Sequence, residues 1–221
     1  INDPRLMAGM PPALTAATGM DAMSHAVESY VSTVATPLSD ACGMQAIKLV
    51  SRWLRLAVGN GANLEARDKM AYAQFLAGLA FTNGRLGCTH SIAHQLGGRY
   101  GIPHGVGCGV MLPYVCDYNL IAAPERFAEI AAAMGENIEG LTVMEAAAKA
   151  PTAIRKLNQD IGLPANLAEL GVKEADLELL AQNAMNDGTR TTNPRQPVTF
   201  ESMLFIVRSA LATPLVKATG V

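Results

Sequence analysis

The sequence predicts an all-α fold, with a single helical domain spanning residues 1–221. Hydrophobic residues make up 50% of the chain, so a substantial core can be buried. Alanine, leucine and methionine dominate, whereas the alternating β-branched runs that are typical of half-buried strands are absent. The length of the chain fits one large domain or two small ones. Because the sequence contains no repeat, linker or low-complexity segment, we expect one domain.

The first part of the chain divides into several expected helices. Two prolines, Pro11 and Pro12, stand where a short first helix would begin, because proline favours the first helical position. The segment Gly59-Asn60-Gly61 is a break between two longer helices. Longer helices are expected over about residues 19–32, 39–58 and 64–82.

Histidines gather in the middle of the chain. Gly84 and Gly87 open a segment that contains three of them, and this segment is expected to include a helix. A further apolar helix is expected to start at Pro103-His104-Gly105 and to run toward Tyr118.

Capping and composition define the remaining elements. Thr142 and Glu145 form a capping box for a helix that ends near Asp160. Residues 187–195 have the composition of a loop. Further helices are expected over about residues 173–185 and, as a closing element, 200–211.

Composition excludes several classes of partner and location. A net charge of −2 provides no basic surface for nucleic acid, and no apolar stretch approaches the roughly 20 residues of a membrane span. The N-terminus has no signal-peptide pattern and no initiator methionine, so we expect the chain to begin within a longer gene product. None of the four cysteines forms a C-x-x-C pair, and we expect reduced thiols in a cytoplasmic protein.

All four histidines and one aspartate form a pattern that indicates a metal site. Asp21 and His25 are four residues apart on one expected helix, and His90 and His94 repeat that spacing on another. His104 follows a glycine-rich turn. Carboxylates and imidazoles are ligands of iron and zinc. Five candidates exceed the needs of a catalytic metal with one open position, so one of them is expected not to be a ligand.

The glycines after His104 do not form a nucleotide-binding loop. The segment Gly105-Val106-Gly107-Cys108-Gly109 follows no expected strand and does not satisfy G-x-G-x-x-G. We therefore expect these glycines to allow close helix packing beside His104.

Two segments carry a family resemblance. The segment GMDAMSHAVE at residues 19–28 resembles one signature of the iron-containing (group III) alcohol dehydrogenases. The segment GCTHSIAHQLG at residues 87–97, continued by PHG at residues 103–105, resembles the other. Asn193-Pro194-Arg195 matches a short family element, and the resemblance extends from about residue 3 to residue 195.

The resemblance implies a ligand set. In this family the residues that match Asp21, His25, His90 and His104 hold the metal, whereas the residue that matches His94 lines the site. Imidazole suits both iron and zinc, so the ligands do not decide between them. Similar family members mostly use ferrous iron, so the resemblance implies Fe²⁺, with Zn²⁺ as the alternative. The metal then acts as a Lewis acid on the alcohol oxygen.

The resemblance also implies a second domain outside this chain. Family members have the dehydroquinate synthase-like architecture, in which a nucleotide-binding domain precedes the helical metal domain. NAD or NADP is therefore expected to bind mainly to that missing domain, and the 221-residue chain is expected to be inactive alone. Expected partners are that domain, a small alcohol or aldehyde, and further copies in a homo-oligomer.

Several residues receive roles from the same resemblance. We expect His94 to be a proton relay, because imidazole exchanges protons near neutral pH, with structural support of the site as the alternative. Phe81, Cys88 and Thr189 are expected to line the substrate pocket, although Cys88 and Thr189 depart from the residues common in the family. Glu28 lies seven residues after Asp21 and is expected to be a supporting carboxylate rather than a base.

Two other functions fit the same residues. One is a zinc-dependent polyol dehydrogenase of the glycerol type. The other is a metal-binding or oligomerisation module without catalysis. A non-haem iron oxygenase is disfavoured, because its two-histidine, one-carboxylate site is typically built on a β-barrel, and the chain is helical.

Overall fold

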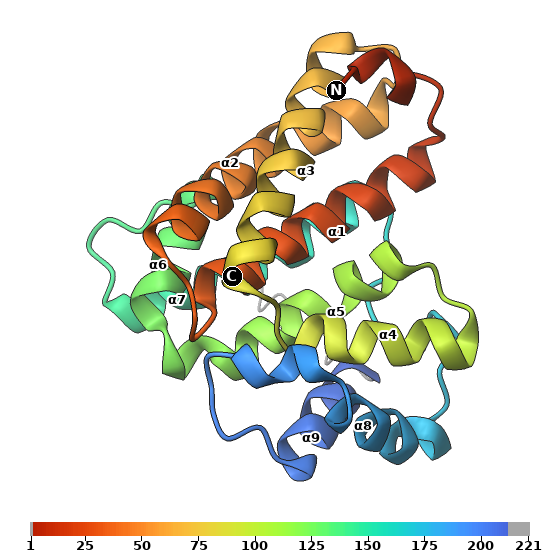
Figure 1. Cartoon of the computed structure of the whole chain (residues 1–221), viewed down its shortest axis with the longest axis vertical. Helices are drawn as coiled ribbons and strands as arrows, with labels where there is room; N and C mark the ends of the chain where they lie inside the picture. Colours follow the sequence, from red (N-terminus) through yellow and green to blue (C-terminus); the bar gives the residue numbers. More distant parts are fainter. Residues whose placement is uncertain (1, 212–221) are drawn as a thin grey trace, which may run out of the picture.

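The computed structural model describes residues 2–211, and these residues form helices without any strand, which confirms the predicted all-α fold (Figure 1). Four short 3-10 helices connect or precede the longer ones. The α-helices are α1 (Pro12–Val31), α2 (Pro37–Gly59), α3 (Leu64–Gly84), α4 (Cys88–Tyr100), α5 (His104–Asn119), α6 (Pro124–Ala133), α7 (Val143–Asp160), α8 (Leu177–Met185) and α9 (Phe200–Leu211).

Local capping explains most of the helix starts. The Thr36 hydroxyl and Ser39 form a reciprocal capping box at the start of α2, and the Asn63 side chain caps α3. The capping box expected at Thr142 and Glu145 is confirmed, and α7 ends at Asp160 as predicted. The closing helix expected over residues 200–211 is α9.

Three details of the predicted helices were wrong. Pro12 does not start a short separate helix, because α1 continues without a break from Pro12 to Val31. The helix α6 was missed, although Pro124 occupies its favoured first position and Glu125 follows in the first turn. The expected helix over residues 173–185 begins with a 3-10 turn, and the expected loop contains a second one at Gly188–Thr192.

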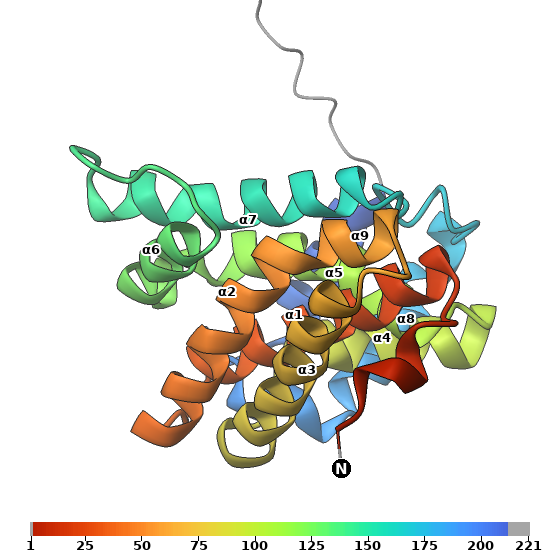
Figure 2. The same ribbon diagram turned by 90° about the horizontal axis from the view of Figure 1, so that it is seen from above.

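The core consists of two hydrophobic clusters that share α5. One cluster lies among α1, α2, α3, α6 and α7, and the other among α4, α5, α8 and α9. Figure 1 shows α4 and α5 between the group of α1, α2 and α3 and the pair of α8 and α9. Figure 2, turned by 90°, shows α7 across the top of the view. Within residues 2–211, every helix falls short of the length and apolarity that a membrane crossing requires.

Close packing of α5 against α1 depends on glycine, as the sequence predicted. A Cβ atom at Gly105 would lie 2.1 Å from the backbone oxygen of Ala17 in α1. At Gly109 a Cβ would lie 2.9 Å from Leu163 Cδ1 and 3.1 Å from Met20 Cβ. The start of α5 can therefore approach the backbone of α1, and this approach brings His104 to the face of α1 that carries Asp21.

Candidate metal centre

Three helices direct nitrogen atoms at one carboxylate oxygen. Asp21 and His25 come from α1, His90 from the first turn of α4, and His104 from the first residue of α5. The Asp21 Oδ1 atom lies 3.3 Å from His104 Nε2, 3.6 Å from His90 Nε2 and 3.8 Å from His25 Nε2. The four residues predicted as metal ligands therefore lie together around Asp21 Oδ1, and we call this group the centre.

The centre contains polar atoms that the protein itself does not satisfy. Asp21 Oδ1 and His90 Nε2 are both buried and have no hydrogen-bond partner. Buried polar atoms in folded proteins nearly always have a partner, so two orphaned atoms that face each other require an explanation. A divalent cation between them would accept lone pairs from both, and the residues present therefore fit a metal.

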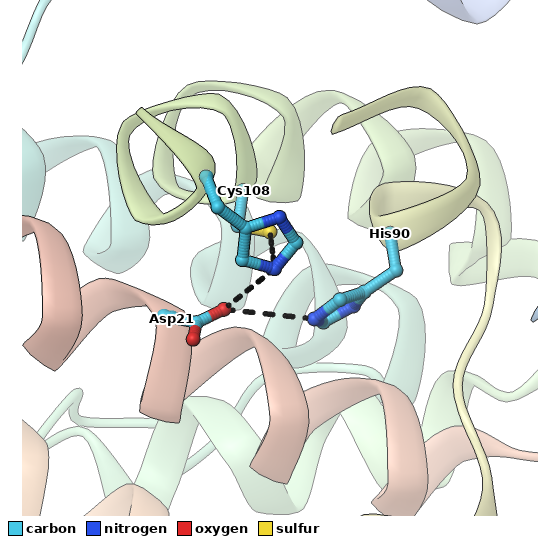
Figure 3. A group of neighbouring side chains, drawn as sticks. Asp21, His90 and Cys108 are labelled. Atoms are coloured by element: carbon cyan, nitrogen blue, oxygen red, sulfur yellow. Dashed lines mark hydrogen bonds and ion pairs between the residues drawn. The ribbon is translucent and has the colours of Figure 1, made fainter. Parts of the chain in front are cut away.

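A cysteine that the sequence analysis did not select also belongs to this region. The ligand atoms of Asp21, His90, His104 and Cys108 all lie within 4.8 Å of one another. Figure 3 shows Cys108 in one group with Asp21 and His90. Cys108 follows His104 by four residues on α5, and this helical spacing was a signal that could have identified it.

The ring of His25 is held between two other rings. It stacks on Phe81 with a centroid distance of 4.4 Å and on His90 with a centroid distance of 4.7 Å. His25 Nε2 remains near Asp21 Oδ1, but His25 is outside the group of four mutually close ligand atoms.

The surroundings of the centre favour an ionised Asp21 and a neutral His25, which are the forms that bind a metal. Burial opposes ionisation of Asp21, but the close imidazoles of His104, His90 and His25 hold its pKa well below the usual range. Burial lowers the pKa of His25 to about 4. Interaction with Asp21 and Cys108 raises the pKa of His104 to about 10, so a bound cation would replace a proton there.

Glu28 fixes the orientation of His90. The carboxylate is 4% exposed, and its Oε2 lies 2.7 Å from His90 Nδ1. It also accepts hydrogen bonds from the backbone N–H groups of Gly87, at 3.0 Å, and Thr89, at 2.6 Å, which begin α4. These contacts leave His90 Nε2 facing Asp21, which is the arrangement that a supporting carboxylate would provide.

Glu28→Gln is expected to destabilise the fold by about 1–3 kcal/mol, because its new amide donors would oppose donors in a buried position. It is also expected to weaken metal binding by about 10-fold or more, since His90 loses its orienting carboxylate. Urea denaturation and metal titration measure the two effects. The control is Glu139→Gln in an exposed loop, and equal behaviour of the two variants would contradict the role given to Glu28.

His94 forms a pair with an aspartate that the sequence analysis missed. His94 Nδ1 lies 2.7 Å from Asp187 Oδ2, and the ring of His94 stacks on that of His104 with a centroid distance of 5.4 Å. Asp187 Oδ1 accepts hydrogen bonds from both the backbone N–H and the hydroxyl of Thr189. Asp187 is 93 residues from His94, and nothing in the local sequence indicated the contact.

The loop that carries Asp187 is anchored by the family element at residues 193–195. Asn193 is buried and exchanges side-chain hydrogen bonds with Asn119 at the end of α5. Arg195 donates to the carbonyl oxygen of Tyr118 and lies over the Tyr118 ring. Both contacts attach the loop to α5, the helix that begins with His104, and so position Asp187 relative to the centre.

Two of the three predicted pocket residues border cavities. Phe81 lines a cavity of about 290 Å³ together with Asp21 and His25, and also a second cavity of about 620 Å³ that Thr189 lines. Cys88, in contrast, is fully buried in the second hydrophobic cluster, and the structure does not bring it to either cavity.

Fold and centre together define a helical domain that gathers one carboxylate and several imidazoles from three helices around one point. Residues 15–211 match the model of the Fe-containing alcohol dehydrogenase family, C-terminal, and the chain belongs to this family. This finding confirms the resemblance deduced from the two histidine segments.

Known relatives agree with this assignment. The chain is 59% identical over 196 residues to 1,3-propanediol dehydrogenase of Klebsiella pneumoniae. The matched residues are 89% of this chain and 51% of the relative. The chain is 51% identical to the NAD-dependent methanol dehydrogenase of Bacillus methanolicus, with 96% of this chain and 55% of the relative covered. The solved structure of a 1,3-propanediol oxidoreductase superposes with a TM-score of 0.93 at 55% identity, over 95% of this chain and 55% of that one. The chain thus spans about half the length of the curated relatives that it matches.

Proposed function

We propose that the chain is the metal-binding part of an NAD(P)-dependent alcohol dehydrogenase that interconverts small primary alcohols or diols and aldehydes. One observation carries the proposal. Asp21 Oδ1 has imidazole nitrogens from three helices within 3.8 Å, and it shares a buried, unpartnered position with His90 Nε2. The substrate class is supported by relatives named for 1,3-propanediol and methanol.

The proposed ligands are Asp21, His25, His90 and His104. Fe²⁺ is the proposed ion because the family is described as Fe-containing, and Zn²⁺ is the alternative because carboxylate and imidazole bind both. When bound, the metal supplies Lewis acidity, which lowers the pKa of an alcohol hydroxyl and polarises an aldehyde carbonyl. A single carboxylate among neutral imidazoles leaves the centre net positive, which favours an alkoxide.

His94 is the proposed proton relay. Its Nδ1 is held by Asp187, so Nε2 is the nitrogen that can exchange a proton with the alcohol or with water. The side chain of His94 is 42% exposed, which gives it a route to solvent. Phe81 and Thr189 border the adjoining cavities and are proposed to contact the carbon chain of the substrate.

The remaining parts of the enzyme are proposed from the family. NAD or NADP binds mainly to a nucleotide-binding domain that would precede these residues, and the B. methanolicus relative is named as NAD-dependent. The enzyme is proposed to be a cytoplasmic homo-oligomer. The four cysteines are free thiols and buried, as expected for a reducing location.

Elemental analysis of the purified chain, loaded anaerobically with Fe²⁺ or Zn²⁺, tests the proposed centre. About one ion per chain is expected. A chain that retains neither ion after loading would contradict the proposal.

The 221-residue polypeptide alone is expected to show no NAD-dependent oxidation of 1,3-propanediol or methanol. The reason is that residues 2–211 form no strand and the sequence contains no G-x-G-x-x-G loop to bind the pyrophosphate. NADH formation is measured by absorbance, with a full-length relative assayed in parallel as the positive control. Sustained turnover by the polypeptide would refute the expected dependence on a separate nucleotide-binding domain.

A further inference from the structure

Cys108 lies inside the centre, and we infer that its sulfur is a further ligand of the metal, together with Asp21, His90 and His104. The inference rests on the proposed metal function and adds a residue that the four predicted ligands do not include. It implies that the chain can offer a coordination set with one sulfur, one oxygen and two nitrogen atoms.

Helix geometry places the sulfur beside a proposed ligand. Cys108 follows His104 by one helical turn on α5, so both side chains project from the same face of that helix. The Cys108 Sγ atom lies 3.5 Å from His104 Nε2, and Figure 3 shows the sulfur joined to the ring nitrogen that also contacts Asp21. The side chain of Cys108 is fully buried, and its sulfur lies among the donor atoms of Asp21, His90 and His104.

Three of the six distances among the donor atoms lie in the range found around one tetrahedral metal ion, and all six are within 4.8 Å. Ligand atoms about 2.0–2.3 Å from a zinc-like ion are about 3.3–3.8 Å apart in a tetrahedron. The donor atoms of Asp21 and His104 are 3.3 Å apart, those of Asp21 and His90 are 3.6 Å apart, and those of His104 and Cys108 are 3.5 Å apart. The orphaned Nε2 of His90, on a side chain only 1% exposed, belongs to this same group of atoms.

Binding of the metal by sulfur requires the Cys108 thiol to lose its proton. The thiol of Cys108 binds as a thiolate, and the proton that it releases passes to the solvent buffer, without any redox change. Five donors exceed the four of a tetrahedral site, so the thiolate and the imidazole of His25 compete for one position. Because thiolate is a soft ligand, this competition favours zinc more than an all-nitrogen-and-oxygen set would.

Cobalt substitution tests the inference without an activity assay. Co²⁺ takes the same nitrogen, oxygen and sulfur ligands, and a bound thiolate produces an intense sulfur-to-cobalt charge-transfer band in the near ultraviolet. The wild-type chain loaded with Co²⁺ is expected to show this band. Cys108→Ser and Cys108→Ala are expected to lose the band completely while still binding cobalt.

Two matched variants serve as controls. Cys88→Ser removes another fully buried thiol, which lies outside the group of donor atoms, and is expected to keep the band. His25→Ala is also expected to keep it, because removal of the competing imidazole leaves the position to sulfur. X-ray absorption at the metal edge of the wild-type chain counts sulfur neighbours directly, so the test does not depend on the folding of any variant.

The outcomes separate the two proposals. Three results would refute the sulfur ligand but not the metal centre. They are cobalt that binds without the band, a band that persists in the Cys108 variants, and a metal edge without a sulfur neighbour. A chain that binds no cobalt would overturn the metal centre of the proposed function, and the sulfur ligand with it. Cobalt bound with a band that only the Cys108 variants lose supports both.

Discussion

Replacing His90 and His104 together by alanine is expected to reduce the metal content from about one ion per chain to none. The two imidazoles come from different helices, α4 and α5, and each lies within 3.6 Å of Asp21 Oδ1. Without them, no more than Asp21, His25 and Cys108 remain as donors. Elemental analysis of the wild-type and variant chains after the same anaerobic loading measures the effect.

The histidine on the neighbouring turn of α4 is the matched control. His94 is bonded to Asp187 and lies outside the group of mutually close donor atoms, so His94→Ala is expected to keep the full metal content. A double variant of His90 and His104 that still binds a full complement would show that the ion is held elsewhere. Circular dichroism confirms that both variants remain helical before their metal contents are compared.

The five candidate residues of the centre were predictable because their spacing is local, and the resemblance then selected four of them as ligands. The spacing of Asp21 and His25 within α1 places both on one helix face, and the sequence contains few other histidines to compete. Cys108 shows the same spacing relative to His104, but a cysteine in an apolar, glycine-rich helix resembles an ordinary core residue. The sequence analysis therefore passed over a donor whose position became evident only when α1, α4 and α5 were seen together.

Contacts between residues far apart in the sequence could not be predicted from local sequence patterns. Asp187 meets His94 across 93 residues, and nothing in its surrounding polar loop distinguishes it from a turn aspartate. Cys88 adjoins a histidine segment in sequence, yet the first turn of α4 points it into the second hydrophobic cluster. Side-chain direction at such positions depends on tertiary packing, which the one-dimensional pattern does not contain.

The helices were more predictable than their boundaries. The capping box at Thr142 correctly predicted the start of α7, and the glycines around residue 60 correctly predicted the end of α2. Such signals are reliable because capping depends on only a few neighbouring residues. Prolines were less reliable signals, because Pro113 and Pro151 lie inside α5 and α7 without ending them. Tertiary packing of the apolar faces offsets the lost backbone hydrogen bond at each of these positions.

The close approach of α5 to α1, which brings His104 to Asp21, depends on one glycine. Gly105 immediately follows His104, and the backbone of α1 at Ala17 occupies the space that a side chain at position 105 would need. A backbone carbonyl cannot rotate away as a flexible side chain can, so relief of the clash requires α5 to move away from α1. Such a movement also separates His104 from Asp21.

Gly105→Ala is therefore expected to lower the free energy of unfolding by about 3 kcal/mol. It is also expected to reduce metal affinity, because α1 and α5 each supply ligands. Gly98→Ala in α4 is the matched control, since a Cβ there meets nothing within 4 Å, and alanine is expected to stabilise that helix by up to about 1 kcal/mol. Urea denaturation and metal titration of both variants separate steric clash from helix propensity. If Gly105→Ala behaved like Gly98→Ala, the close approach of α5 to α1 would not be what holds the centre together.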